Sequence, residues 1–242
     1  MLERSLTEEQ LWSKLPTLQG EDLVALLAHP SASQRHIIKV LQRRELPEVF
    51  LRRVAGSEWI RSTRIKFFFV NHPGAPLAEA MNFVKFLFWR DLNYTTMNFL
   101  VATEVRHLAE SVLIQRLQSM AVGEKITLAR QAGGQILKRL RHEKDPRVVS
   151  GLLENPRIVE DDVLFIVNQA RTPAPILESI ARDAKWATRR EVQVSLLRNG
   201  NTPLSAVIGF VRRLPAPQAR MLADDPKVPV AVRRMLKTRL GG

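Results

Sequence analysis

One stretch of this chain occurs twice, and the duplication constrains the fold more than any other feature. The first copy covers residues 47–87 and the second covers residues 173–214. Allowing one inserted residue, the following positions agree: Leu51/Leu177, Ala55/Ala181, Trp59/Trp186, Leu77/Leu204 and Val84/Val211. Such self-similarity is typical of repeat proteins, in which each unit buries its apolar face against a neighbour. The agreeing positions are therefore expected to form contacts between stacked units.

Helix signals dominate the rest of the sequence. Thr7 and Gln10 have the spacing of a capping box. Apolar residues recur at helical spacing in residues 204–214, and almost no segment alternates with period two. The segments are short and end at Pro, Gly or Asn, so no segment can bury its apolar face alone. These features predict an all-α protein, an α-solenoid of short helical repeats.

The predicted solenoid spans residues 1–242 as a single array. Residues 91–96 are expected to form a loop or a frayed turn, because they are polar and irregular. The array divides into N-terminal capping helices (1–45), a first repeat block (46–90), an irregular helical connector (91–130) and a second repeat block with a C-terminal capping helix (131–242).

Three phrases carry a resemblance to a known class of repeat. They are LLRNGNTPL at 196–204, LADDP at 222–226 and SIARD at 179–183. They resemble the leucine-rich-repeat-variant pattern of bacterial proteins, which is similar to HEAT-like repeats in bacterial proteins of unknown function. The resemblance is clear over 130–242 and looser over 31–90. It implies a right-handed superhelix of short HEAT-like helical repeats and implies no activity.

The composition excludes several kinds of chemistry. The chain has no cysteine, so disulfides, thiolate catalysis and cysteine-bound metal clusters, including the iron–sulfur cluster of one leucine-rich-repeat-variant type, are excluded. The first residues lack the apolar core of a signal peptide. The most apolar stretch, residues 65–89, contains charged residues and prolines, so we expect no membrane span. A cytoplasmic location is the resulting expectation.

No arrangement of residues predicts a catalytic or cofactor site. The five histidines have no metal-ligand spacing, so no metal, cofactor or small-molecule substrate is expected. Gly133-Gly134-Gln135 matches the tripeptide of peptidyl-tRNA-hydrolysing release factors, but a Gly-Gly turn between helices is favoured. The acidic run at 160–162 is interpreted as the first turn of a helix, where the helix dipole favours carboxylates.

The net charge of +13 is concentrated in three blocks, 31–90, 130–147 and 198–242. Arginine pairs recur near helix ends, and stacking of repeats could align them into one stripe that contacts phosphate. The alternative, which the sequence favours, is that arginine stems cover neighbouring helices and that the guanidinium groups cap carbonyls. The candidate stripe consists of Arg52, Arg53, Lys85, Arg189, Arg190, Arg212 and Arg213.

Aromatic residues gather in one region. Nine of the 15 aromatic residues lie within residues 67–99. Phe86 and Trp89 fall off the apolar stripe of their predicted helix, so they either form an exposed patch for a partner or are buried. Burial against residues 91–122 is favoured.

The leading functional hypothesis is a non-enzymatic helical-repeat scaffold that binds another macromolecule, a protein in preference to nucleic acid, through its basic surface. The alternative is a HEAT-like protein that binds nucleic acid, at the extreme a DNA glycosylase of the alkylation-repair type, which this chain loosely resembles. A glycosylase would use a carboxylate beside an aromatic wall, such as Asp183 near Trp186 or Asp91 near Trp89. Packing between repeats explains Trp59 and Trp186 better.

Overall fold

The computed structural model describes residues 2–241 and is entirely helical over that range. It contains seventeen α-helices and three 3₁₀ helices, with no strand among the described residues. Contacts within the chain divide it into two compact units, Met1–Gln118 (unit 1) and Ser119–Gly242 (unit 2). The all-α prediction is confirmed, whereas the single array over both units stays a prediction.

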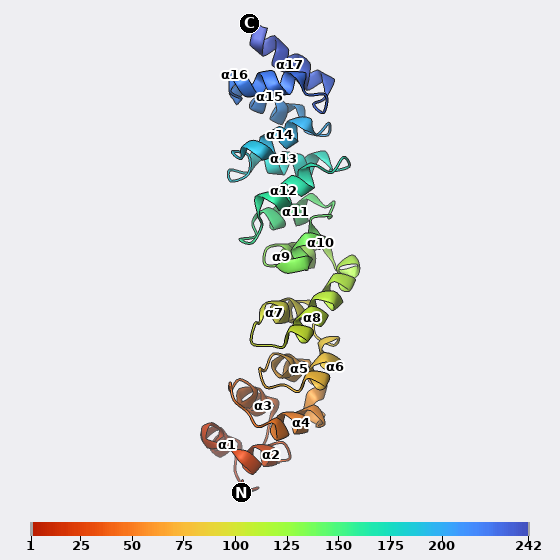
Figure 1. Ribbon diagram of the computed structural model, residues 1–242. Helices are drawn as coiled ribbons and strands as arrows, with labels where there is room; N and C mark the ends of the chain where they lie inside the picture. The colour runs from red at the N-terminus through yellow and green to blue at the C-terminus, as the bar shows by residue number, and fades with distance from the viewer. Residues whose placement is uncertain (1, 242) are drawn as a thin grey trace. The chain divides into compact units, whose positions relative to one another are not determined.

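Unit 1 consists of short helices arranged in two rows. The odd-numbered helices form one row and the even-numbered helices form the other (Figure 1). Within the rows, α2 packs on α4, α3 on α5, and α6 on α8. The elements are α1 (Glu8–Lys14), η1 (Leu15–Thr17), α2 (Gly20–Leu26), α3 (Gln34–Leu41), α4 (Glu48–Ala55), η2 (Glu58–Arg61), α5 (Thr63–Val70), α6 (Leu77–Val84), α7 (Trp89–Met97), α8 (Thr103–Arg116) and, at the boundary, η3 (Leu117–Ser119).

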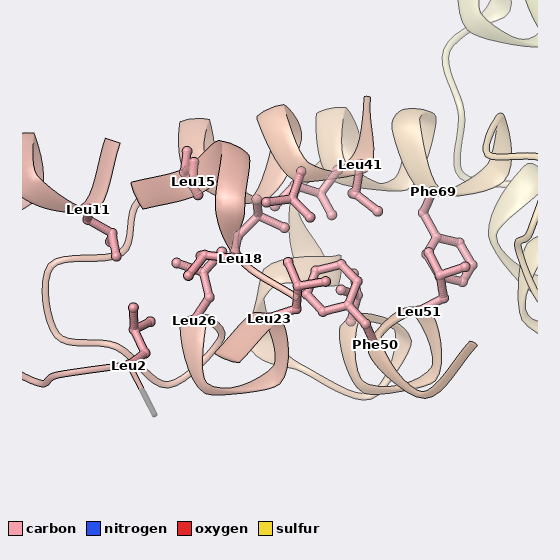
Figure 2. Packing of buried hydrophobic residues seen from close by; sticks show 14 of the residues in the cluster. Leu2, Leu11, Leu15, Leu18, Leu23, Leu26, Leu41, Phe50, Leu51 and Phe69 are labelled. Atoms are coloured by element: carbon pink, nitrogen blue, oxygen red, sulfur yellow. The ribbon is translucent and has the colours of Figure 1, made fainter. Parts of the chain in front are cut away.

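The core of unit 1 lies between these rows. Leu11 and Phe69 extend from the odd-numbered row, and Leu26 and Phe50 extend from the even-numbered row; all four are fully buried. Figure 2 shows side chains of this cluster between the helices that carry them. Because each short helix contributes only a few apolar residues, most of its stability comes from this packing.

The start of α1 follows the predicted capping box. The Thr7 hydroxyl accepts the backbone N–H of Gln10 at 3.3 Å, and the Gln10 side-chain oxygen accepts the Thr7 N–H at 2.9 Å. Two backbone donors that lack a partner inside the helix are thereby satisfied.

The prediction of a loop at residues 91–96 is wrong, because these residues lie inside α7. Asp91 lies in the first turn of α7, where the helix dipole favours a carboxylate. The Thr95 hydroxyl donates to the Asp91 carbonyl at 2.8 Å, and Asn93 and Thr95 are buried. The helix also packs extensively on α8. Tertiary burial therefore holds this polar segment in a helix that its local pattern did not indicate.

Unit 2 repeats the same packing scheme. Each of α9, α11, α13 and α15 packs on the second helix that follows it, and α12 packs on α14. The helices are α9 (Val122–Ala129), α10 (Gly134–Leu140), α11 (Pro146–Leu153), α12 (Glu160–Val167), α13 (Ala174–Arg182), α14 (Arg190–Arg198), α15 (Leu204–Arg213), α16 (Ala216–Asp224) and α17 (Val230–Gly241).

Two predictions about local structure in unit 2 are confirmed. Gly134 has φ +53°, a backbone conformation that favours glycine, and it begins α10, so the Gly-Gly pair forms a turn. The acidic run forms the first turn of α12. There Asp162 accepts the backbone N–H of Val159 at 3.1 Å and pairs with Arg141 at 2.9 Å.

Polar side chains link each helix to the end of the second helix before it. In unit 1, His72 Nε2 lies 2.9 Å from the Arg43 carbonyl, and Asn98 donates to the Asn71 carbonyl at 3.3 Å. In unit 2, Asn155 donates to the Ala129 carbonyl at 2.6 Å. Asn199 donates in the same way to the carbonyl of Val167. We call His72, Asn98, Asn155 and Asn199 the linking residues.

Each linking residue makes a second, local hydrogen bond. Its side-chain acceptor takes the backbone N–H two residues further on, for example Gly74 for His72 at 3.0 Å and Arg157 for Asn155 at 2.8 Å. A linking residue therefore closes its own turn and also satisfies a carbonyl at a helix end, which has no partner within its own helix.

Three arginines serve helix ends in the same way. Arg43 donates to the carbonyls of Leu15 and Leu18, Arg116 to those of Lys85 and Leu87, and Arg239 to those of Val211 and Leu214. For these arginines the carbonyl-capping interpretation is confirmed. None of them belongs to the predicted basic stripe.

The duplicated tryptophans pack in the interior. Trp186 is 2% exposed. Trp59 is partly buried against the core of unit 1, and its indole N–H donates to the Leu27 carbonyl at 2.9 Å. The packing interpretation of both residues is confirmed.

Candidate nucleic-acid interface

The residues of the predicted basic stripe in unit 1 have different surroundings. Arg52 forms ion pairs with Glu48 at 2.7 Å and with Glu79 at 3.2 Å. The hydrogen bond that Arg52 donates to the Glu48 carboxylate raises the pKa of Arg52 above its usual value. Arg53 is exposed, and Lys85 is exposed with its Nζ 5.5 Å from the ring centroid of Phe86. The charge of Arg52 is thus neutralised by its neighbours.

The remaining residues of the stripe lie in unit 2. Arg189, Arg190, Arg212 and Arg213 are all exposed. Arg189 lies 3.9 Å from Glu160, and the guanidinium of Arg213 lies 5.7 Å from the ring centroid of Phe210. Arg213 also lines a hollow that contains the carboxylate of Asp183. Two of these four arginines therefore have an acidic residue close by.

Phe86 and Trp89, which were both expected to be buried, differ in their exposure. Phe86 is 56% exposed, so the expectation of burial is wrong for this residue. It follows the end of α6, where the ammonium groups of Lys66 and Lys85 lie 5.4 and 5.5 Å from its ring centroid. Trp89 is half-buried at the start of α7, with the Arg90 guanidinium 5.1 Å from its ring centroid.

A different surface of unit 1 is hollowed. Three adjoining hollows lie along the row of α1, α3, α5 and α7 (Figure 1). The first hollow, of ≈ 430 Å³, and the second, of ≈ 530 Å³, share Trp12, Lys39 and Gln42. The second and the third, of ≈ 420 Å³, share Arg64. Neighbouring hollows share lining residues, and we call the surface that the three hollows form together the groove.

The groove carries basic side chains that form no ion pair within the described residues. Arg35, Lys39 and Arg64 are exposed and form no ion pair within residues 2–241. Arg43 also lines the first hollow, but its guanidinium is committed to backbone carbonyls, and burial lowers its pKa. Three cations are therefore free to attract an anion.

Aromatic side chains lie at both ends of this group of cations. Trp12, 36% exposed, lies against His36 with ring centroids 4.5 Å apart, and lines the first two hollows. In the third hollow, the Phe67 ring meets Phe68 edge-on at 5.2 Å, while Phe88 is 65% exposed. We call the surface formed by the following residues the basic-aromatic face: Trp12, Arg35, Lys39, Arg64, Phe67, Phe68 and Phe88.

One carboxylate lines the groove. Asp91 shares the third hollow with Thr63, Arg64 and the three phenylalanines. Burial raises the pKa of Asp91, while the Phe88 N–H and the charge of Arg64 act in the opposite direction. The third hollow thus combines flat apolar walls with one acidic and one basic group.

The basic stripe predicted from arginine pairs shares no residue with the basic-aromatic face. Arg35 and Lys39 are single cations at i and i+4, a spacing that places them on one side of α3. That spacing was a usable signal. The contribution of Arg64 and Trp12 could not be seen, because they come from other helices and join α3 only through the packing of the row.

Other kinds of site are not found in the described residues. Within residues 2–241, no three His, Asp or Glu side chains gather in a way that could hold a metal ion. No helix over that range is long and apolar enough to cross a membrane. Comparisons with protein-family models, with curated proteins and with solved structures found no match.

Proposed function

We propose that this chain is a non-enzymatic binding protein whose basic-aromatic face binds single-stranded nucleic acid. One observation carries the proposal: Arg35, Lys39 and Arg64 form no ion pair within the described residues and line adjoining hollows together with aromatic rings, Trp12 at one end and Phe67, Phe68 and Phe88 at the other. Proteins that bind single strands combine a basic groove that follows the backbone with aromatic rings on which bases stack.

The shape of the groove favours a single strand over a duplex. Its aromatic walls in the third hollow offer ring faces and edges that only an unstacked base can reach. Arg52, which is paired with two glutamates, lies outside the groove, whereas Arg35, Lys39 and Arg64 line it.

The salt dependence of binding tests the proposal. We expect the affinity for a fluorescein-labelled oligo(dT), measured by anisotropy, to fall with a log–log slope of about −2, because three phosphate contacts release counterions at about 0.7 each. Between about 50 and about 200 mM salt the affinity should fall about 20-fold. Duplex DNA of the same length should bind more weakly.

Substitutions of the three cations test whether the basic-aromatic face binds the strand. Arg35→Gln, Lys39→Gln and Arg64→Gln should each reduce the salt slope by about 0.7. Arg130→Gln is the matched control, because Arg130 lies in unit 2 and pairs with Glu154 at 2.8 Å. The proposal is wrong if the wild-type protein ignores oligo(dT) at low salt, or if the triple variant binds as the wild-type protein does.

A protein partner is the second candidate, and the loop between α7 and α8 favours it. Phe99 is 82% exposed and Leu100 is 59% exposed, an apolar pair on the surface of unit 1. Pull-down from nuclease-treated lysate, followed by mass spectrometry, should then recover a partner that the Phe99→Ser/Leu100→Ser variant does not recover. Loss of every partner on nuclease treatment would argue against this candidate.

The proposal includes the finer description of the fold and of the cell compartment. A right-handed solenoid of HEAT-like, leucine-rich-repeat-variant units is supported by helices that pack on the second helix before them and by the linking residues. A cytoplasmic location rests on the absence of cysteine. Glycosylase activity is not included, because Asp183 accepts the backbone N–H groups of Lys185 and Trp186 and so serves its own turn.

A further inference from the structure

The third hollow of the basic-aromatic face has the chemistry of a pocket for one base. Its volume of ≈ 420 Å³ falls within the range of roughly 300–1,000 Å³ that is typical of small-ligand sites. It is lined by Thr63, Arg64, Phe67, Phe68, Phe88 and Asp91. Three of these six residues are phenylalanines, so the pocket offers stacking surfaces on which any base could lie.

The two charged groups of the hollow narrow the choice of base. A carboxylate accepts hydrogen bonds and cannot donate them while it is ionised, whereas a guanidinium only donates. Asp91 lines the hollow, and its carboxylate can accept two hydrogen bonds from a ligand. Arg64 forms no ion pair within the described residues, so its donors are available to a ligand.

Guanine fits this pair of groups better than the other bases. It presents two adjacent donors, N1–H and N2–H₂, which a carboxylate accepts together, and two acceptors, O6 and N7, which suit arginine. Adenine and cytosine place an acceptor beside their amino group, and thymine and uracil place their single N–H between two carbonyl oxygens. Each of these would set an acceptor against the carboxylate of Asp91.

We infer that the hollow between α5 and α7 holds a guanine base, with Asp91 accepting from its N1–H and N2–H₂ edge and Arg64 donating to O6 or N7. Phe88, the most exposed ring of the hollow, stacks on the base. This inference rests on the proposed function and adds a base preference to it.

Anisotropy with three strands tests the inference: oligo(dT), oligo(dT) with one central dG, and the same strand with deoxyinosine in place of dG. We expect the dG strand to bind about tenfold more tightly than oligo(dT), with most of that gain lost for deoxyinosine, which lacks the N2 amino group. Guanosine monophosphate as competitor separates a pocket for any guanine nucleotide from one that needs the strand.

Variants locate the preference. Asp91→Asn retains an oxygen that can accept the Phe88 N–H, and should bring the ratio of dG-strand to oligo(dT) affinity close to one. Glu124→Gln is the matched control, because Glu124 caps α9 in unit 2 by accepting the Ala121 N–H at 3.1 Å; it should leave the ratio unchanged. Phe88→Leu, at an exposed position, should lower the ratio while retaining both charges.

The outcomes separate the two proposals. Failure of the wild-type protein to bind any strand overturns the proposed function. Equal binding of the three strands, or a dG preference that survives Asp91→Asn in a variant with a wild-type thermal melt, overturns the guanine pocket and leaves the proposed function in place. Should Asp91→Asn fail to fold, the deoxyinosine strand and Phe88→Leu decide the question by themselves.

Discussion

The two units solve the same packing problem with two kinds of side chain, histidine and asparagine, of which unit 1 uses both. In unit 1 the buried linking residue between α5 and α3 is His72, whereas in unit 2 the corresponding links, from α11 to α9 and from α14 to α12, are made by Asn155 and Asn199. Each of these residues accepts a backbone N–H two positions on and reaches a carbonyl at the end of an earlier helix. The fold therefore requires one donor and one acceptor at this position, and not a particular amino acid.

The units also differ in how they use charge. In unit 2, ion pairs join residues that lie on successive elements, as in Arg141–Asp162, Lys125–Glu143 and Arg198–Asp225. In unit 1, the cations of the basic-aromatic face have no such partners within the described residues. We assign binding to unit 1 because its free cations Arg35, Lys39 and Arg64 line hollows that also contain aromatic rings.

The largest effect is expected at a linking residue of unit 2. Asn155 is 1% exposed and donates to the carbonyls of Ala129 and Ala132 at 2.6 and 2.9 Å. Asn155→Ala leaves these carbonyls and the Arg157 N–H without their partner, so the free energy of unfolding should fall by about 3 kcal/mol. Urea unfolding followed by circular dichroism measures the loss.

Asn168→Ala provides the control for this experiment, because Asn168 is an exposed residue at the end of α12 in the same unit. Its change in unfolding free energy should be within about 0.5 kcal/mol of zero. A loss of under 1 kcal/mol for Asn155→Ala would show that the links follow the packing of the helices and do not stabilise it.

A smaller effect is expected for His72, the linking residue between α5 and α3. It should appear as a dependence of the free energy of unfolding on pH. His72 Nε2 must carry the proton to donate to the Arg43 carbonyl, and Nδ1 must be free of one to accept from Gly74. Burial lowers the pKa of His72 below its usual 6.5, and burial likewise lowers the pKa of His36. Both residues are therefore neutral in the folded state at a pH where the unfolded chain binds protons.

The direction of the pH effect follows from the difference in proton binding between the folded and the unfolded chain. The stabilisation is complete above pH 6.5 and is lost as the pH falls from 6.5 toward the folded-state pKa, by at most about 1.4 kcal/mol per histidine and pH unit. His72→Asn copies the arrangement of unit 2 and should remove its share of the loss between about pH 7.5 and about pH 5.5. Urea midpoints at both pH values test this. Exposed His142, changed to Asn, serves as control, and an unchanged pH dependence in His72→Asn contradicts the prediction.

The sequence revealed the apolar part of the repeat and concealed the polar part. Leu51, Leu177 and Trp186 could be predicted as core residues because apolar burial leaves a periodic pattern. The same expectation is wrong for Leu77 and Leu204, which are 43% and 63% exposed at the starts of α6 and α15. The equivalence of His72 and Asn155 could not be predicted, because two unlike side chains meet the same hydrogen-bonding requirement. The helix at residues 89–97 was missed for a related reason, since burial of Asn93 and Thr95 depends on α8.

In the candidate site, too, some features could be predicted from the sequence and others could not. Arginine pairs are conspicuous in the sequence, but a charge count does not distinguish Arg52, which is paired with two glutamates, from Arg64, which is not paired. Nor does it identify Arg43 as a cap on helix ends. The groove arises from helices α1, α3 and α5, whose side chains become neighbours only when the row is assembled.

The smallest effect is expected at Arg212 and Arg213, two residues of the basic stripe that was predicted from the sequence. If phosphate contact is confined to the face of unit 1, Arg212→Gln/Arg213→Gln should leave the oligo(dT) affinity and its salt slope unchanged. Both residues are exposed in unit 2, but Arg213 shares its hollow with Asp183 and no exposed aromatic ring. The double variant Arg35→Gln/Lys39→Gln, which removes the same charge, should reduce the slope by about 1.4. Equal reductions in both double variants, measured by anisotropy, would mean that charge alone attracts the strand and that the groove of unit 1 adds nothing to it.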